Sequence, residues 1–198
     1  RRWYGNNDLV VNWENDGQEI RNFKDSKGKL RSRPQNIQYF GKEGGTWTSL
    51  TIASFSMRYV PQGHIFADKG PMIFKNGNAS ILHIIALYNS IVADRYLKVL
   101  APTLDYAIGP VSSLPIVFDA QIQEVESLAA QAIAISKREW DSLERSFDFR
   151  IPYFIENNNS NIESAFARNI EFFTELKDNL SAIEEKIDRI FIDTYGLE

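Results

Sequence analysis

The stretch SILHIIALYNSIVADRYLKVL, residues 80–100, is apolar on most sides when it is wound into a helix. A helix of this kind is normally covered on several faces by other parts of the fold. We therefore predict a central core helix over these residues, with the rest of the domain built around it.

Short β-rich segments precede this helix. Between residues 46 and 74 they read TWTSLTI, SFSMRYV, HIFA and PMIF, with turn signals at PQG (61–63) and DKG (68–70). β-branched and aromatic residues bounded by Pro, Gly and Asp are typical of strands joined by tight turns. A further strand is predicted at Leu9–Trp13. The sequence therefore predicts an α+β fold, in which a small, mostly antiparallel sheet packs against a buried core helix.

Amphipathic helices follow the core helix. Apolar residues recur every three or four positions from Phe118 to Ile135, which predicts a helix. Ser136 with Glu139, and Ser160 with Glu163, are capping-box patterns that predict two further helix starts. The last helix carries an apolar seam at Phe166, Ile170, Phe173, Leu176, Leu180, Ile183, Ile187 and Ile190. Such a seam needs a partner, either the preceding helices or a neighbouring domain.

The proline and asparagine run at residues 151–160 interrupts the helical pattern. We read it as a linker between a domain at residues 1–150 and a C-terminal helical segment at residues 161–198. The chain has no methionine at its first position, and we expect it to be a piece of a larger protein.

Composition narrows the class of protein. The 198 residues include no cysteine, and 43% are hydrophobic, without any apolar run long enough for a membrane span. We expect neither secretion nor membrane insertion, and a cytoplasmic location. The net charge of −4 is unevenly divided, because residues 1–115 carry 14 Lys and Arg against 9 Asp and Glu, whereas residues 116–198 carry 8 against 17. A cationic half of this kind can steer toward phosphate groups.

Sequence motifs typical of catalytic sites do not occur in this chain. The segment FGKEGGT (40–46) lacks the spacing of a phosphate-binding loop, and no GxSxG or GxGxxG motif occurs. The two histidines, His64 and His83, are far apart, and His83 fits a core position better than a metal ligand. We expect no catalytic centre, cofactor site or metal site within this chain.

Several long strings give the chain a family resemblance. They are RRWYGNNDLVVNWENDG (1–17), SRPQN (32–36), TWTSLTIASFSMRYVPQGHIFADKGPMIF (46–74), LYNSIVADRYLKVLAPTLDYAIGPVSSLPI (87–116), ISKREWDSLERSFDF (135–149) and IFIDTYGL (190–197). Together they resemble the C-terminal region of the PglX (BrxX) adenine-specific DNA methyltransferases of bacteriophage-exclusion (BREX) systems. The region concerned is similar to a TaqI-like target-recognition domain followed by helices.

The resemblance implies a division of labour. In this family an upstream domain holds S-adenosylmethionine and an Asn-Pro-Pro-Tyr/Phe loop that receives a flipped adenine, and neither motif occurs in this sequence. The chain would then be the part that recognises double-stranded DNA for adenine-N6 methylation. Its expected partners are DNA, the methyltransferase domain of the same parent chain and other BREX components. S-adenosylmethionine would be the cofactor of that parent protein.

The segment KGKLRSRPQN (27–36) is the strongest candidate for DNA contact. Lys27, Lys29, Arg31 and Arg33 alternate, so in an extended segment they would share one face suited to a phosphate backbone. Gln35 and Asn36 follow Pro34, and their amides can read adenine, as arginine can read guanine. The alternative is a solvated hairpin loop whose side chains satisfy backbone carbonyls.

Four further residues complete the predicted DNA-binding set. Lys42 and Lys69 lie in turn-like segments, and Arg58 and Tyr59 lie at the end of a predicted strand. For Arg58 an internal ion pair is the alternative. For the whole chain the alternative is a protein-interaction module that assembles a defence or restriction-modification complex through its helical seam and acidic surface.

Overall fold

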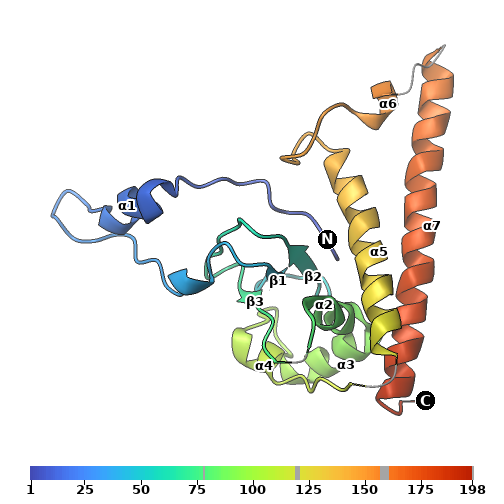
Figure 1. Cartoon of the computed structure of the whole chain (residues 1–198), viewed down its shortest axis with the longest axis horizontal. Coiled ribbons are helices and arrows are strands. Elements are labelled where there is room, and N and C mark those ends of the chain that lie inside the picture. The colour runs from blue at the N-terminus through green and yellow to red at the C-terminus, as the bar shows by residue number, and fades with distance from the viewer. Residues whose placement is uncertain (78, 119–120, 157–160, 198) are drawn as a thin grey trace.

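The computed structural model describes residues 1–77, 79–118, 121–156 and 161–197. Figure 1 shows a small sheet with helices beside it, two long helices along one side, and an arm that projects from the other side. No helix in the described ranges is both long and apolar enough to cross a membrane. The predicted α+β fold is confirmed.

The sheet contains the strands β1 (Gly44–Trp47), β2 (Met57–Val60) and β3 (Met72–Ile73), in the order β2-β1-β3. Both pairings are antiparallel, and Trp47 lies opposite Met57. Gly44 lets the central strand approach β3 closely, because a Cβ there would lie 2.5 Å from the carbonyl oxygen of Ile73. A side chain at this position would therefore push the two strands apart.

Two predicted strands do not form. The segment HIFA (64–67) is a loop, joined to the turn before β1 by a 2.8 Å hydrogen bond from the Gly41 N–H to the His64 carbonyl. Leu9–Trp13 is not a strand either, and the Leu9 side chain is 90% exposed. Both segments have strand-like composition, but a strand needs a run of paired backbone groups, and no such ladder forms beside either segment in the described chain.

The predicted core helix is two helices, α2 (Ile81–Asn89) and α3 (Ile91–Leu100). The chain turns at Ser90, whose ψ of 160° is not helical. The Ser90 hydroxyl donates to the Leu87 carbonyl at 2.7 Å and accepts from the Ala93 N–H at 3.3 Å, so it satisfies a backbone group of each helix. Eight of the nine α2 residues are buried, which confirms its central position.

The helix α2 is joined to the sheet by Asn89. Its side-chain oxygen accepts from the Met57 N–H and its amide donates to the Met57 carbonyl, both at 2.9 Å. Asn89 is only 4% exposed. It therefore acts as a strand partner for the first residue of β2.

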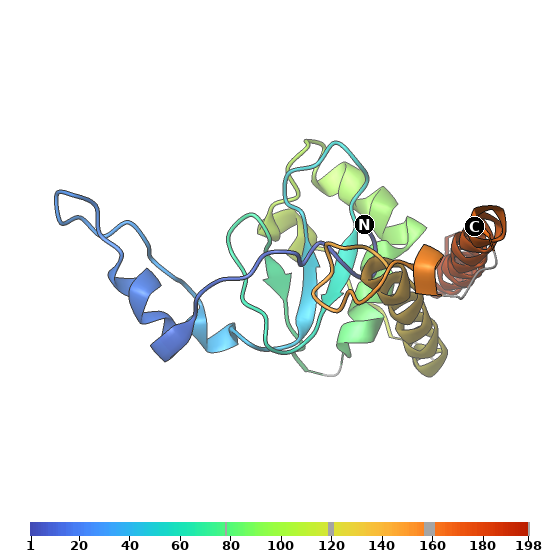
Figure 2. The same cartoon turned by 90° about the horizontal axis from the view of Figure 1, so that it is seen from above.

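Two long helices, α5 (Ile122–Asp141) and α7 (Ile162–Thr194), form one side of the molecule. The short helix α4 (Ile108–Ser112) precedes α5 in the chain, and the short helix α6 (Tyr153–Glu156) precedes α7. Figures 1 and 2 show α5 and α7 side by side. The predicted helix start at Ser136 is wrong, because α5 continues through it and buries it. The apolar face runs on to Trp140, so a capping-box pattern alone could not end the helix.

The seam of α7 folds back on the preceding helices over its C-terminal half. Ile183, Ile187 and Ile190 are buried in the same core as α2 and α5. Phe166 and Ile170, nearer the start of α7, are 59% and 51% exposed. The buried face there shifts to Ala165 and Phe172, because Tyr153 of α6 stacks on Phe172 with ring centroids 3.8 Å apart.

The start of α7 is capped one residue later than predicted. The Asn161 side chain accepts from the Ser164 N–H at 2.8 Å. Ser160, the predicted cap, lies outside the described residues. The division of the chain at residues 151–160 stays a prediction.

Asp188 links α7 to α3 and supplies a first prediction. Its carboxylate accepts from the Ile91 N–H at 2.7 Å, at the start of α3, and burial raises its pKa. Asp188→Asn keeps an acceptor oxygen, so we expect the free energy of unfolding at pH 7 to change by less than about 1 kcal/mol. Asp188→Ala leaves the Ile91 N–H unpaired and is expected to cost about 1–2 kcal/mol.

Urea unfolding at two pH values checks this prediction. Because the pKa of Asp188 is higher in the folded state, the folded chain binds the proton more readily. The wild type should therefore gain stability relative to Asp188→Asn as the pH falls through the folded pKa toward the lower pKa of the unfolded chain. Equal losses for Asn and Ala would contradict the proposed role as an acceptor.

Candidate nucleic-acid interface

The arm of the molecule consists of residues 8–43, and it leaves the body beside the sheet (Figures 1 and 2). It contains α1 (Glu14–Asn22) and the short helix η1 (Ile37–Tyr39). Between them lies a cationic hairpin, residues 23–33, with five basic residues and one acid. The basic residues are Lys24, Lys27, Lys29, Arg31 and Arg33.

The hairpin is held by its own backbone. The Asp25 N–H donates to the Lys29 carbonyl at 2.9 Å, and the Arg31 N–H donates to the Phe23 carbonyl at 2.8 Å. Gly28 takes a positive φ of 78° in the turn. The single carboxylate, on Asp25, accepts from the backbone N–H groups of Lys27 and Lys29 at 3.0 and 2.9 Å. It therefore organises the turn, and no described hydrogen bond or ion pair joins it to a basic side chain.

The four alternating cations remain exposed, but they do not form one extended row. Lys27 lies in the turn, whereas Lys29, Arg31 and Arg33 alternate along the returning segment. None of the ion pairs among the described residues uses any of the four. The turn is thus a hairpin, as in the alternative reading, yet the Arg33 and Gln35 side chains form no described bond to a carbonyl.

The returning segment of the arm lines a cleft of about 800 Å³. Arg31, Arg33, Gln35 and Asn36 contribute to this cleft, together with residues from the loop before β3 and from β3 itself. The other lining residues are Trp13, Ile20, Ser32, Pro34, Tyr39, Phe40, Ile65, Phe66, Ala67, Asp68, Pro71, Met72, Phe74 and Ile108. The structure therefore brings two predicted cations and both predicted amides to a single hollow.

Aromatic rings at this cleft connect the arm to the body. Phe40 packs edge-on against both Trp13 and Phe66, with centroids 5.1 and 5.0 Å apart. Tyr39 stacks on Phe74 at 4.9 Å. Tyr39 and Phe40 thus hold the C-terminal end of the arm against the body, and Trp13 packs on Phe40 within the arm.

Lys42 and Lys69 are exposed, as their prediction requires. The Lys42 ammonium lies 4.9 Å from the centre of the Tyr39 ring, at the base of the arm. Lys69 lies in the turn closed by the 3.1 Å hydrogen bond from Gly70 to Ala67, next to the cleft residue Asp68.

Sequence reasoning missed two exposed lysines. They are Lys24, in the hairpin, and Lys75, which follows β3. Lys24 stands beside a predicted turn and Lys75 follows a predicted strand, and these positions could have indicated that both side chains are exposed.

The prediction that Arg58 contacts DNA at the surface is wrong. It is 5% exposed on β2, and its guanidinium donates to the Thr48 hydroxyl at 3.2 Å, without an ion pair among the described residues. Burial lowers its pKa. Tyr59 is half-buried and donates to Glu43 at 2.9 Å, and burial together with this carboxylate raises its pKa to about 12. Both side chains hold the sheet.

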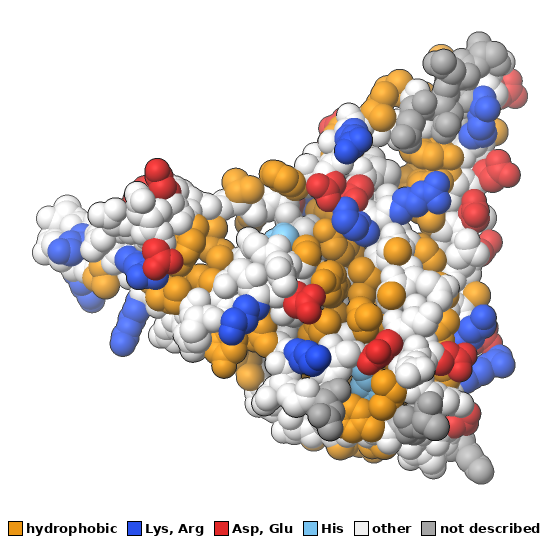
Figure 3. Space-filling model, viewed as in Figure 1, with side chains coloured by type: hydrophobic (Ala, Val, Ile, Leu, Met, Phe, Trp, Pro, Cys, Tyr) orange, Lys and Arg blue, Asp and Glu red, His pale blue; other side chains and the backbone are white. Residues whose placement is uncertain are grey.

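The carboxylates of the acidic half make no described ion pair with the basic side chains of the arm, although Arg145 pairs with Asp8 at the start of the arm, 2.6 Å away. Two of these carboxylates pair instead with the first residues of the chain: Arg1 with Glu139 at 2.9 Å, and the Trp3 indole N–H with Glu184 at 2.7 Å. Figure 3 shows Lys and Arg side chains on the arm, and many of the visible Asp and Glu side chains along the long helices. Both signs of charge occur along the long helices, whereas the hairpin at residues 23–33 carries five basic residues and one acid.

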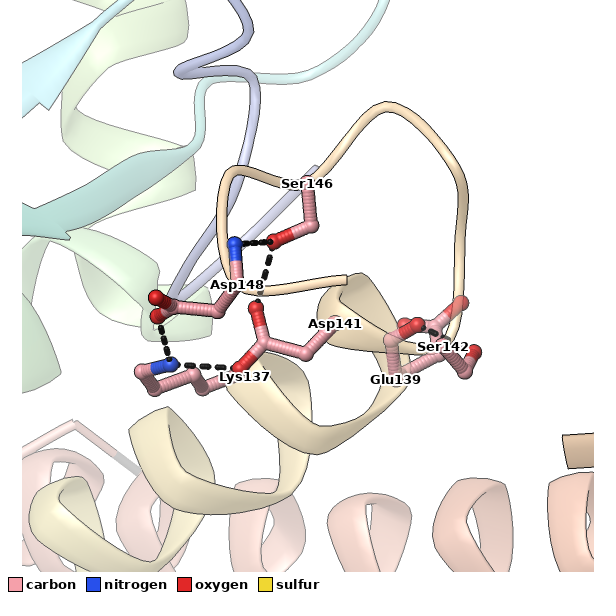
Figure 4. Close-up of polar contacts among 6 residues, drawn as sticks. All are labelled: Lys137, Glu139, Asp141, Ser142, Ser146 and Asp148. Atoms are coloured by element: carbon pink, nitrogen blue, oxygen red, sulfur yellow. Dashed lines mark hydrogen bonds and ion pairs between the residues drawn. The ribbon is translucent and has the colours of Figure 1, made fainter. Parts of the chain in front are cut away.

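A second polar cluster closes the end of α5 (Figure 4). Lys137 contacts Asp141 and also Asp148, the latter at 2.6 Å, and Ser146 donates to Asp141 at 2.7 Å. The contact with Lys137 lowers the pKa of Asp148. These pairs fold residues 142–150 back onto α5, so this cluster is explained by local structure.

Metal ligands do not gather in the described ranges, where no three His, Cys, Asp or Glu side chains could hold an ion together. His83 is buried between Phe118 and Phe191, with ring centroids 5.5 Å from each. This confirms that it is a core residue.

Comparison with known proteins shows which proteins this chain is related to. No family model matches the chain. Over its whole length it is 36% identical to the adenine-specific methyltransferase PglX of Lacticaseibacillus casei strain Zhang, and 34% identical to the adenine-specific methyltransferase BrxX of Escherichia coli O9:H4 strain HS. The chain is a homologue of one segment of these PglX and BrxX methyltransferases.

The homologous segment is a small part of each relative. The chain covers 17% of PglX and 16% of BrxX, about one sixth of their length. The resemblance drawn from the sequence is confirmed at this level. Its further likeness to a TaqI-like target-recognition domain stays a prediction.

Proposed function

We propose that this chain is a module that recognises double-stranded DNA for an adenine-specific methyltransferase. The observation that carries the proposal is the cationic hairpin, which projects from the body and has basic side chains free of carboxylate partners among the described residues. Duplex DNA carries one negative charge for about every 1.7 Å of its axis, so an exposed cationic hairpin suits it. The homology to PglX and BrxX supports the same reading.

The geometry separates two tasks along the arm. Lys27 and Lys29 lie at or near the tip of the hairpin and Arg31 lies at its base, where all three can contact phosphates and position the module. Arg33, Gln35, and Asn36 beyond it, lie at the cleft and have the fork-like groups that read base edges. Lys42 and Lys69, near the base of the arm, would add phosphate contacts.

Methyl transfer itself would take place elsewhere in a parent protein. We assign S-adenosylmethionine and the adenine-N6 chemistry to its methyltransferase domain, which would be the main protein partner of this chain, with other BREX components as further partners. The biological role would be the marking of host DNA during phage defence in the cytoplasm.

A salt titration of duplex binding tests this proposal. The 198-residue chain is mixed with a randomised 30-base-pair duplex pool, and the affinity is measured between about 50 and 300 mM salt. If three or four cations contact phosphates, the logarithm of the affinity should fall with the logarithm of the salt concentration with a slope of about −3. Absence of binding at the lowest salt concentration would overturn the proposal.

A protein-interaction module is the second candidate. Its supporting observation is the exposed apolar start of α7, where Ile162, Phe166 and Ile170 are 78%, 59% and 51% exposed. Such a stripe is typical of a helix that meets another protein surface. This candidate gains if the duplex titration fails.

A further inference from the structure

One apolar side chain of the cationic hairpin is left open to solvent. Phe23, at the base of the hairpin, is 59% exposed. No ring contact among the described residues includes it, although many other aromatic rings of the chain pack in clusters. Its exposure therefore serves no packing role that the described structure shows.

The register of the hairpin fixes which side chains share a face with Phe23. Lys24 lies opposite Leu30 in an antiparallel bridge, so Phe23 lies opposite Arg31 and Asp25 lies opposite Lys29. Side chains alternate between the two faces of such a ladder. Phe23, Lys29 and Arg31 therefore belong to one face, together with Asp25, whose carboxylate accepts from the backbone N–H groups of the turn, and Leu30 belongs to the other face with Lys24.

We propose that Phe23 makes an apolar contact with the bases of duplex DNA while Lys29 and Arg31, on the same face, hold the flanking phosphates. This inference rests on the proposed function and adds a contact that charge alone does not supply. Major grooves accept a two-stranded ribbon, and thymine methyl groups and base faces offer apolar surface between rows of phosphates.

The charge pattern selects DNA as the occupant. An apolar protein patch that covered Phe23 would also have to remove water from the Lys29 and Arg31 side chains, which have no carboxylate partner among the described residues. DNA presents phosphate to the cations and base surface to the ring at the same time. It therefore matches both parts of this face.

The test compares two polyanions, one with bases and one without. Phe23→Ala is expected to weaken binding of the 198-residue chain to the randomised duplex pool about ten-fold, because base contacts of an aromatic ring are of that order. Binding to inorganic polyphosphate, which has no bases, should stay within two-fold. The slope of affinity against salt should not change, because no cation is removed.

Two variants control for structure. Leu30→Ala removes a side chain that is 47% exposed from the opposite face, and it should change duplex binding by less than two-fold. Phe23→Trp keeps a large ring and should retain most of the affinity. Circular dichroism melting should be unchanged for all three variants, since neither position belongs to the core.

The outcomes separate this inference from the proposed function. If Phe23→Ala leaves duplex binding unchanged while loss of the hairpin cations weakens it, the apolar contact is wrong and the DNA-binding role stands. Equal loss on duplex and polyphosphate also overturns the contact, because the ring would then only support the hairpin. If the cation variant binds duplex as well as the wild type does, both ideas fail.

Discussion

Replacing the four alternating hairpin cations by alanine is expected to reduce the affinity for duplex DNA by a factor of about one hundred at 100 mM salt. The positions are Lys27, Lys29, Arg31 and Arg33, all exposed. Each phosphate contact that is lost also removes about 0.9 from the slope of log affinity against log salt. The slope of the variant should therefore become much shallower, because only Lys42 and Lys69 of the proposed set are left to contact phosphates.

The control for this variant changes the same net charge at the opposite side of the molecule. It replaces four exposed cations of α7 by alanine: Arg168, Lys177, Lys186 and Arg189. If the hairpin is the interface, this control should retain the wild-type slope and nearly all of the affinity. Equal losses in the two variants would show that only net charge matters, and would remove the hairpin from the interface.

A second group of single variants divides phosphate contact from base readout. Among the hairpin and cleft residues, loss of a phosphate contact weakens binding to every sequence alike, whereas loss of a base contact changes the preferred sequence. Sequencing of the duplexes bound from the randomised pool measures this difference. We expect Lys27→Ala to leave the preference intact and Gln35→Ala to alter it.

The largest loss of stability is expected at Asn89. Asn89→Ala should lower the free energy of unfolding by about 2–3 kcal/mol, because the Met57 N–H loses its acceptor inside the core. The Met57 carbonyl is less affected, since it also accepts from the Trp3 N–H at 3.0 Å. In this variant the side-chain hydrogen bonds that join α2 to β2 through Asn89 and Met57 are lost.

Asn89→Asp is a sharper form of the same test. The carboxylate still accepts from the Met57 N–H, but it repels the Met57 carbonyl and places a charge in the core, so we expect a loss of about 3–5 kcal/mol at pH 7. Burial raises the pKa of such a carboxyl, and its protonated form can donate to the carbonyl again. The deficit relative to wild type should therefore shrink as the pH falls.

Urea unfolding followed by circular dichroism measures both Asn89 variants. The matched control is Asn76→Ala, an exposed asparagine in the loop after β3. It should change stability by less than about 0.5 kcal/mol. A deficit for Asn89→Asp that does not depend on pH would contradict the proposed geometry.

Local pattern predicted the elements of the fold better than their ends. Apolar spacing identified α5 and α7, because the same period runs along each helix and needs no knowledge of distant residues. The break at Ser90 was missed, since its flanks are equally apolar and the turn is favoured by what Asn89 bonds across the core. HIFA and Leu9–Trp13 have strand-like composition, but pairing depends on a neighbour.

The candidate interface was predicted in part for the same reason. The run of basic residues at 27–33 is visible as letters, and its exposure follows from a hairpin that its own backbone closes. Arg58 has the same charge, yet the sheet buries it. Phe23 is apolar and would be assigned to a core, yet the arm holds it in solvent.

By itself, then, the amino-acid sequence determined the class of fold, the two long amphipathic helices, the concentration of positive charge before the sheet and the resemblance to PglX and BrxX. These are properties of short windows or of aligned strings. Only the tertiary structure decided which cations reach solvent, where the core helix turns and how the seam of α7 is covered. The physical reason is that burial and pairing join residues far apart in the chain, such as Asn89 with Met57 at a separation of 32 and Trp3 with Glu184 at a separation of 181, which no local pattern encodes.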